Sequence, residues 1–350
     1  MPDGHPLADG RTAQSPLIRA YRGDRPERRP VWFMRQAGRS LPEYRELRAG
    51  GDMLQACLTP ELAAEITLQP VRRLGVDAAI FFSDIVIPVK LAGIDVRIVP
   101  GRGPVMDDPI RTASDVLRLP PLDPDALAPI STAVSAAVAE LGSTPLIGFG
   151  GAPFTLASYL VEGGPSKDQL RTRAMMTADP HAWAGLLNWC ADVTGAFLRA
   201  QVLAGASAVQ LFDSWVGSLS RRDYQRRVAP HSRRAYDALR GLDVPRVHFG
   251  LGTGEILDLL PGIGATVVGV DWRLPLDEAN RRLGGSVPLQ GNIDPALLLT
   301  PWPAIVAHVR SVLELGAEAP AHVVNLGHGV PPEADPDVLA RIVELVHAEG

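Results

Sequence analysis

Short runs of apolar, β-branched and aromatic residues recur along this chain, and segments with helical spacing separate most of them. The runs are apolar throughout rather than alternating, a pattern typical of parallel strands that helices cover. The sequence therefore predicts eight strands. They fall in residues 31–34, 77–84, 145–150, 207–214, 245–250, 265–271, 287–292 and 322–327.

The intervening segments carry helix signals. Residues 181–203 and 335–350 place apolar side chains three and four positions apart, which predicts helices with one face in the core. Thr59 followed by Pro60 is typical of a helix start, and Gly142 after an apolar stretch is typical of a helix end.

Eight strand and helix units in one chain favour a (β/α)8 TIM-type barrel, which we expect to form a single domain over residues 16–350. A doubly wound parallel sheet is the alternative. Residues 89–122 contain a short extended pair, and we expect them to elaborate the loop after the second strand. Residues 1–15 are rich in proline, glycine and charge and predict a flexible N-terminal arm.

Composition narrows the class of protein. Hydrophobic residues make up 46% of the 350 residues and charged residues 21%, which is typical of a globular protein with a large core. The formal net charge of -5 gives no reason to expect nucleic acid or an anionic membrane as partner. No apolar stretch reaches the roughly 20 residues that span a bilayer, and residues 1–20 lack the apolar region of a signal peptide.

Cys57 and Cys190 are the only cysteines, and they form no C-x-x-C motif. The sequence therefore predicts neither a disulfide framework nor a cysteine-rich metal site, and a reducing cytoplasm is the expected location. Lysine is almost absent, since Lys90 and Lys167 are the only two. This scarcity limits Schiff-base chemistry.

Polar residues follow seven of the eight predicted strands, where a barrel carries its active site. We expect them to converge on one face of the molecule. They are Arg35, Arg39, Ser83, Asp84, Thr155, Asp213, Ser214, Asp271, Asn292, Asp294, Asn325 and His328.

Three of these residues are informative without the others. Arginine presents a planar fork that matches carboxylate or phosphate, so Arg35 and Arg39 predict an anion site, unless they pair with Glu43 or Glu46 nearby. Asp84 closes an apolar run, and a carboxylate there needs an arginine or a cationic or N–H-rich ligand.

Other candidates are weaker. Tyr159 is more typical of a core tyrosine than of a catalytic one, and His328 between two glycines fits either a binding loop or a surface position. Residues 148–155 are rich in glycine but lack the lysine of a phosphate loop and the G-x-G-x-x-G spacing, which disfavours nucleotide binding.

Two longer stretches, residues 30–49 and 148–164, resemble the two signature stretches of the uroporphyrinogen decarboxylase family, which are cofactor-independent enzymes of tetrapyrrole (haem) biosynthesis. The resemblance extends over nearly the whole chain from about residue 15. Further blocks match in the same order at residues 82–85, 211–217, 290–295 and 325–330.

This resemblance implies a (β/α)8 barrel, usually a homodimer, that removes the four acetate carboxyls of uroporphyrinogen III to give coproporphyrinogen III, without cofactor or metal. Among the site residues it implies, Asp84, Arg35 and Tyr159 are expected to be catalytic. The substrate-binding residues that it implies are Arg35, Arg39, Asp84, Tyr159, Ser214 and His328.

Two rival functions remain at this stage. Methyltransferases with a similar barrel are expected to use a zinc site with cysteine and histidine ligands, and the isolated Cys57 and Cys190 do not supply one. A porphyrin-binding or carrier protein that has kept the pocket without turnover is the second rival.

Overall fold

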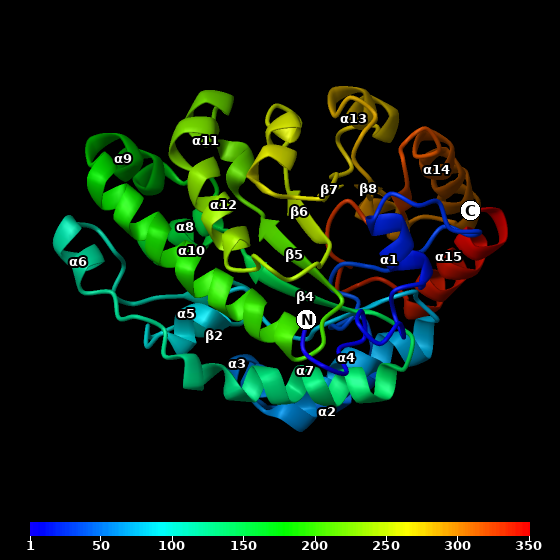
Figure 1. The fold of residues 1–350 in the computed structure, drawn as a ribbon, viewed down its shortest axis with the longest axis horizontal. Coiled ribbons are helices and arrows are strands. Elements are labelled where there is room, and N and C mark those ends of the chain that lie inside the picture. The colour runs from blue at the N-terminus through cyan, green and yellow to red at the C-terminus, as the bar shows by residue number, and fades with distance from the viewer.

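The computed structural model describes residues 1–350 and contains a parallel, curled sheet of seven strands in the order β1-β4-β5-β6-β7-β8-β9 (Figure 1). Helices surround this sheet on its outer side. The sheet strands are β1 (Ala79–Ile80), β4 (Leu146–Gly151), β5 (Ala208–Asp213), β6 (Arg246–Gly250), β7 (Val267–Gly269), β8 (Leu289–Gln290) and β9 (His322–Val323).

The helices connect these strands in sequence. The α-helices are α1 (Pro16–Tyr21), α2 (Pro42–Leu47), α3 (Met53–Cys57), α4 (Pro60–Leu74), α5 (Ile87–Leu91), α6 (Ala113–Leu117), α7 (Ala128–Leu141), α8 (Pro153–Glu162), α9 (Leu170–Ala178), α10 (Pro180–Leu203), α11 (Arg221–Arg227), α12 (Ala229–Asp237), α13 (Leu276–Arg282), α14 (Trp302–Leu315) and α15 (Pro336–Glu349). Short 3-10 helices lie at η1 (Pro124–Leu127), η2 (Val216–Ser218), η3 (Leu257–Leu259), η4 (Pro261–Ile263) and η5 (Pro295–Leu299).

Seven of the eight predicted strands are present, although several are shorter than predicted. The prediction was wrong for residues 31–34, which form only one parallel bridge, between Val31 and Val324. Side chains explain the difference, because they occupy backbone donors that a sheet ladder would use. Phe33 N donates to the side chain of Gln36, and Met34 N donates to the side chain of Asn325.

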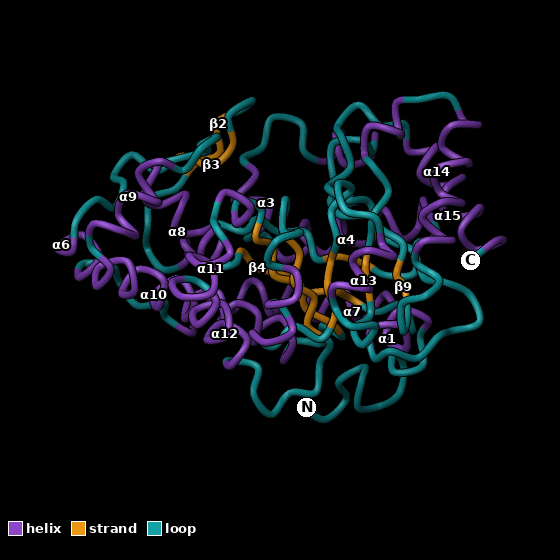
Figure 2. Tube along the Cα trace, turned by 90° about the horizontal axis from the view of Figure 1, so that it is seen from above, coloured by secondary structure: helices purple, strands orange, loops and turns teal.

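The loop after β1 carries the predicted extended pair. Strands β2 (Arg97–Val99) and β3 (Gly103–Val105) form an antiparallel hairpin. Figure 2 shows this hairpin and the N-terminus on opposite sides of the main sheet. The expected elaboration after the second predicted strand is therefore confirmed.

The predicted helix boundaries are also confirmed. Helix α10 covers residues 180–203, and α15 occupies the C-terminal periodic segment. Helix α4 begins at Pro60 after Thr59, and α7 ends at Leu141 before Gly142, whose φ is 60°. That left-handed φ is readily adopted only by residues such as glycine, so Gly142 ends the helix.

One continuous hydrophobic cluster of 97 buried residues runs from the first helix to the last. Inside it a polar chain lies near β8 and β5. Tyr21 donates to Gln290 at 2.5 Å, Trp32 donates to the Tyr21 hydroxyl at 3.1 Å, and Gln290 donates to Gln210 at 3.0 Å. These bonds satisfy polar groups that would otherwise be costly to bury.

Residues 1–15 contact the amino end of β5. The buried His5 ring lies 2.9 Å from the carbonyl oxygen of Val202, and the Thr12 and Ser207 hydroxyls are 2.9 Å apart. These bonds join the N-terminus to the residues just before β5. The flexibility expected of this arm stays a prediction.

No helix is both long and apolar enough to cross a membrane.

Candidate functional site

The turn after the first segment is built around Gln36, a fully buried residue that the sequence analysis did not single out. Its side chain accepts from Phe33 N and donates to the carbonyl oxygen of Ala78, each at 2.9 Å. Next to it Arg35 adopts a φ of 62°, which costs a non-glycine residue about 1 to 3 kcal/mol. The buried amide therefore holds Arg35 in an otherwise unfavourable conformation.

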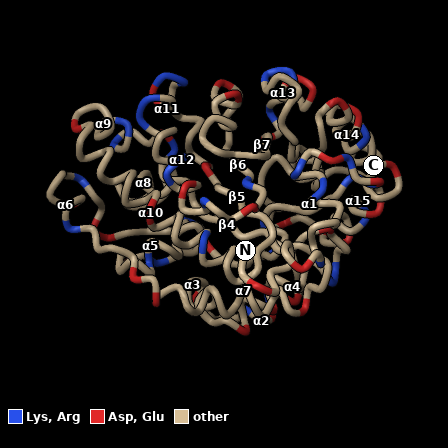
Figure 3. The backbone as a smooth tube through the Cα atoms, viewed as in Figure 1, with Lys and Arg blue, Asp and Glu red and all other residues tan.

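Arg35 and Arg39 are exposed, and neither makes an ion pair or a side-chain hydrogen bond within the chain. The alternative pairing of these arginines with Glu43 or Glu46 is absent, since Glu43 instead lies 3.6 Å from Arg73. Figure 3 shows acidic and basic residues interspersed over the outer helices and loops. Two unpaired guanidinium groups four residues apart are therefore a local exception on an acidic protein.

The loop after β9 brings His328 next to Arg35. A Cβ atom on Gly329 would lie only 2.7 Å from the Cγ of Arg35, so glycine is needed for this close approach. The Nδ1 of His328 accepts from Gly329 N at 2.5 Å, which leaves Nε2 as the protonated nitrogen. Burial, together with the charges of Arg35 and Arg273, lowers the pKa of His328 to about 4. His328 is therefore a neutral hydrogen-bond donor.

A cavity of about 350 Å³ opens between these loops. Arg35, His328, Trp272 and Asp294 line it. Proline-containing segments at residues 295–296 and 330–332 complete its wall. This cavity lies at the carboxyl end of the sheet, as the sequence analysis predicted for the site.

Asp84 lies in the loop between β1 and α5, and its side chain is partly exposed. Its Oδ1 accepts one hydrogen bond, from Val86 N at 3.0 Å, and no cation pairs with the carboxyl group. Burial raises the pKa of Asp84, while Val86 N–H and the charge of Arg35 act in the opposite direction. The carboxyl group is thus poorly satisfied by the protein itself.

Tyr159 on α8 faces the same region. Burial and the charge of Asp84 raise the pKa of Tyr159 to about 12, and Arg35 partly offsets this. Its ring packs on Trp215, with ring centroids 4.1 Å apart and planes inclined by 30°. Ser214, the residue before Trp215, is half-buried and forms no hydrogen bond within the chain. The charges of Asp84 and Arg35 thus both act on the Tyr159 phenol.

Asp271 follows a strand as Asp84 does, but it has a different environment. It is 4% exposed and accepts three hydrogen bonds, from Gly252 N at 2.6 Å, Arg273 N at 3.0 Å and Arg273 Nη1 at 2.6 Å. Asp271 therefore ties the loops after β6 and β7 together and has little capacity left for a ligand.

Two asparagines also connect neighbouring loops. Asn325 accepts from Met34 N at 2.9 Å and Leu326 N at 2.8 Å, and Asn292 donates to the carbonyl oxygen of Asp271 at 2.9 Å. The polar residues that sequence analysis placed on one face thus divide into two groups, one available to a ligand and one engaged in holding loops.

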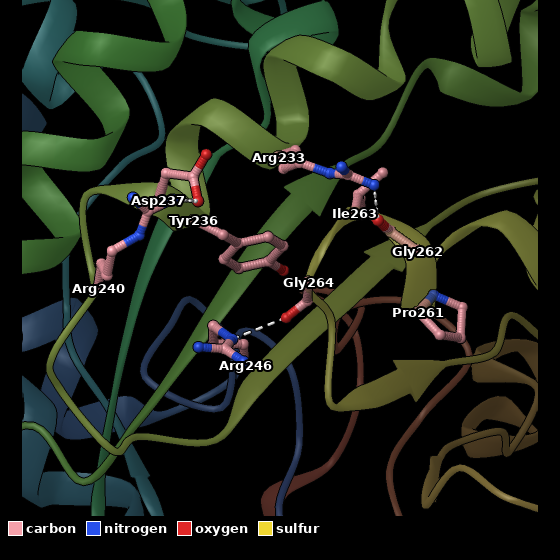
Figure 4. A pocket seen from close by; sticks show the side chains of 9 residues that line it. All are labelled: Arg233, Tyr236, Asp237, Arg240, Arg246, Pro261, Gly262, Ile263 and Gly264. Carbon is pink, nitrogen blue, oxygen red and sulfur yellow. Dashed lines mark hydrogen bonds and ion pairs between the residues drawn. The ribbon is translucent and has the colours of Figure 1, made fainter.

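A second cavity, of about 300 Å³, lies at the amino end of β6 and is rich in arginine (Figure 4). Arg233 and Arg246 donate to backbone carbonyls of the 261–264 loop, and Arg240 pairs with Asp237 at 3.0 Å. These arginines are engaged in holding a loop and a helix end. The unpaired Arg35 in its wall makes the first cavity the stronger candidate.

The cysteines are not placed for metal binding. Cys57 and Cys190 are both buried, and burial raises the pKa of each thiol. Nowhere in residues 1–350 do three or more histidine, cysteine, aspartate or glutamate side chains gather so that they could hold a metal ion.

Comparison with known proteins adds the family. The uroporphyrinogen decarboxylase (URO-D) family model matches residues 12–349. The chain belongs to the uroporphyrinogen decarboxylase family. A uroporphyrinogen decarboxylase from Arthrobacter sp. (strain FB24) is 68% identical over 340 residues, covering 97% of this chain and 99% of that protein. One from Leifsonia xyli subsp. xyli is 61% identical over 364 residues, covering 98% and 97%.

Solved structures agree on the fold of this uroporphyrinogen decarboxylase family member. A methyltransferase from Methanosarcina mazei superposes with a TM-score of 0.80 at 19% identity, covering 96% of this chain and 98% of the other. A B12-independent methionine synthase from Shewanella sp. W3-18-1 gives a TM-score of 0.53 at 12% identity, covering 82% and 87%. At these identities the likeness concerns the fold alone.

Proposed function

We propose that this chain decarboxylates the four acetate side chains of uroporphyrinogen III, giving coproporphyrinogen III and four CO2. The observation that carries the proposal is the pair of unpaired arginines, Arg35 and Arg39, on the same side of the molecule as the poorly satisfied Asp84. A substrate with many carboxylates and ring N–H groups complements both features. Family membership supplies the substrate class.

Loss of CO2 from an acetate arm leaves an electron pair that needs a sink. Pyridoxal, thiamine or a metal supplies that sink in many decarboxylases. Here the substrate itself can supply it, because a proton added to the pyrrole carbon beside the acetate-bearing carbon produces a cationic, imine-like ring. The C–COO bond then releases its electrons into that ring, and CO2 leaves. Protonation of the resulting exocyclic methylene forms the methyl group, and loss of the first proton from the ring carbon restores the pyrrole.

We assign Asp84 to the ring N–H groups. Its carboxyl group has one backbone donor and no cation partner, so a positive ring placed against it gains a strong interaction. The same ring is neutral before protonation, and the interaction is therefore stronger in the transition state than in the ground state. Such differential stabilisation is what accelerates the reaction.

Arg35 and Arg39 bind substrate carboxylates through charge-assisted hydrogen bonds. Arg35 also lies within electrostatic range of Tyr159 and His328, so it connects the ring site with the cavity. His328 donates Nε2–H as a neutral imidazole, and Ser214 is available as a further donor. Arg35 is a poor proton donor because the pKa of a guanidinium lies above about 12.

The finer architecture belongs to the same proposal. We propose that residues 31–34 complete an eight-position barrel, because Trp32 N donates to Val324 O at 3.2 Å on one side and Asp77 N donates to Val31 O at 2.9 Å on the other. A homodimer in the cytoplasm is the assembly and location that we propose with it.

The test is an anaerobic incubation with freshly reduced uroporphyrinogen III and no added metal or cofactor. Products are oxidised and separated by carboxyl number. The proposal predicts the full series from seven to four carboxyls. Recovery of the eight-carboxyl species alone, from protein shown to be folded, would overturn it.

A zinc-dependent methyl transfer is the rival that the shared fold suggests. It is disfavoured because thiolate ligands must be deprotonated, and burial raises the pKa of Cys57 and Cys190. Stoichiometric zinc in the purified protein would revive it. A carrier protein, the second rival, would bind tetrapyrrole tightly and release no CO2.

A further inference from the structure

Behind Tyr159 lies a chain of contacts that the proposed roles do not use. The Tyr159 ring packs on Trp215, and Trp215 N donates to the Thr155 hydroxyl at 3.4 Å. That hydroxyl in turn donates to Asp213 Oδ1 at 2.8 Å. Thr155 and Tyr159 are four residues apart on α8 and therefore share a face of the helix.

The last residue in this series of contacts, Asp213, is buried at a cost in free energy. Asp213 and His248 are both fully buried, and Asp213 Oδ2 lies 3.5 Å from His248 Nε2. That oxygen and both ring nitrogens of His248 make no hydrogen bond. Leaving buried polar groups so poorly paired costs about 1 to 3 kcal/mol for each group. The Thr155 hydroxyl is the well-formed partner of Asp213, which makes that bond important at this position.

The loop that carries Trp215 is confined on its other side. A Cβ atom on Gly217 would lie 3.1 Å from both the Cα and the oxygen of Gly252, so this loop packs directly on the loop after β6. Trp215 itself is half-buried. Thr155 therefore holds the backbone of Trp215, and the loop after β6 confines the loop that carries it. The indole of Trp215 thus presents a fixed face to Tyr159.

We propose that Thr155 is a positioning residue, which holds Trp215 against Tyr159 so that the phenol keeps one orientation toward Asp84. This inference rests on the proposed decarboxylase function. Trp215 restricts the tilt of the ring, since offset aromatic packing has a preferred geometry. Thr155 acts only through Trp215, and Asp213 orients the Thr155 hydroxyl. Substrate carboxylates are bound elsewhere, by the arginines.

The first experiment compares Thr155→Val with Thr155→Ser. Valine keeps the shape and removes both hydrogen bonds, whereas serine keeps the hydroxyl. We expect kcat to fall about 10-fold in Thr155→Val with KM within about 2-fold, and serine to restore most of kcat. Thr172→Val is the matched control, because Thr172 is a buried threonine bonded to Glu162 on another helix. A normal kcat in folded Thr155→Val would overturn the proposal.

A double-mutant cycle then separates positioning from general destabilisation. Tyr159→Phe keeps the ring and removes the phenol oxygen. If Thr155 acts through Tyr159, Thr155→Val should cost almost nothing further in kcat once that oxygen is gone. An equal fall in kcat in both backgrounds would show that Thr155 acts by another route and would overturn the proposal.

Near-ultraviolet circular dichroism tests the packing of Trp215 on Tyr159 without any measurement of activity. Trp215→Leu keeps the backbone bond to Thr155 but removes the indole, so its near-ultraviolet circular dichroism reports loss of the aromatic pair. We expect Thr155→Val to lose part of the same signal, and an unchanged spectrum would contradict the positioning role. If wild-type protein released no CO2 while these spectra behaved as expected, the proposed function alone would have failed.

Discussion

Asp84 and Asp271 are carboxylates in equivalent loops, each just after a sheet strand, yet their surroundings differ completely. Asp271 receives three hydrogen bonds from the protein, two of them from Arg273. Asp84 receives one, from Val86 N. A carboxylate satisfied by its own chain holds loops together, whereas one left with spare acceptor capacity is available for a cationic ligand.

The arginines divide in the same way. Arg273 pairs with Asp271 and packs over the ring of Trp272 at 3.9 Å, while Arg35 and Arg39 pair with nothing in the chain. Position after a strand therefore does not distinguish a ligand-binding residue from a structural one. The number of hydrogen-bond and ion-pair partners that the fold supplies to the side chain distinguishes the two kinds of residue.

The largest expected effect is on Asp84. In Asp84→Asn we expect kcat to fall about 10- to 1000-fold, because the amide cannot stabilise the cationic ring. Stability at pH 7 should be unchanged or higher. The folded pKa of Asp84 lies above its ordinary value of 3.8, so its ionisation costs stability as the pH rises from that value toward the folded pKa. Asparagine removes that cost.

Rates of each of the four decarboxylations and urea unfolding midpoints check this prediction. Near-normal turnover at all four steps would contradict the assignment of Asp84 to the reacting ring.

Removing Arg35 should be the next largest effect. We expect Arg35→Gln to raise KM and to lower kcat, with a fall in kcat/KM of about 10- to 100-fold, the size expected for lost charge-assisted hydrogen bonds. Gly329→Ala should do the same more mildly, since the added methyl must displace the Arg35 side chain.

Steady-state kinetics measure both effects, and Arg22→Gln is the control variant for Arg35→Gln and Gly329→Ala. Arg22 is an exposed arginine paired with Asp243 at 3.1 Å. Equal kinetics for the Arg35 and Arg22 variants would mean that Arg35 is a surface charge without a substrate.

Asp271→Asn tests the comparison between the two carboxylates, because it should affect stability more than turnover. We expect the free energy of unfolding to fall by about 1 to 3 kcal/mol, because Arg273 and Gly252 N lose a nearly buried ionic acceptor. The change in kcat should be only a few-fold. Chemical denaturation of Asp271→Asn beside Asp84→Asn measures it, and a loss of turnover in Asp271→Asn as large as that in Asp84→Asn would erase the distinction between the two carboxylates.

The smallest expected effect concerns His328. Its folded pKa of about 4 lies below its ordinary value of 6.5, so the unfolded chain binds the proton first as the pH falls. Wild-type protein should therefore lose stability between pH 6.5 and pH 4, and His328→Gln should lose about 2 kcal/mol less between pH 7 and pH 5. Urea titrations at the two pH values test this, and an identical loss in both proteins would show that His328 titrates normally.

Much of the fold could be predicted because it depends on local signals. Seven of the eight predicted strands, the α4 start after Thr59 and the α7 end at Gly142 follow from apolar runs, capping residues and glycine. Residues 31–34 could not be assigned correctly, because side chains of Gln36 and Asn325 replace the ladder partners. Asn325 is distant in sequence, and no local pattern reveals such a contact.

The candidate site was predictable in position but only partly in role. Arginine chemistry and the family resemblance pointed to Arg35, and the structure leaves it unpaired. The different roles of Asp84 and Asp271 could not be predicted from the sequence, because they depend on the hydrogen bonds that each carboxylate accepts in the fold. The burial of Gln36 had one indication in the sequence, because this polar residue follows an apolar stretch. The packing of Trp215 on Tyr159 had no indication in the sequence.

The bond between Met34 N and the Asn325 side chain joins positions 291 residues apart, and the Val31 bridge to Val324 lies beside it. During synthesis the partner of this segment leaves the ribosome 291 residues after Met34. The turn that carries Arg35 must therefore wait, with its apolar neighbours Trp32 and Phe33 uncovered, until Asn325 has emerged. A nascent chain stalled before residue 325 should be a preferred client of chaperones that bind exposed apolar segments.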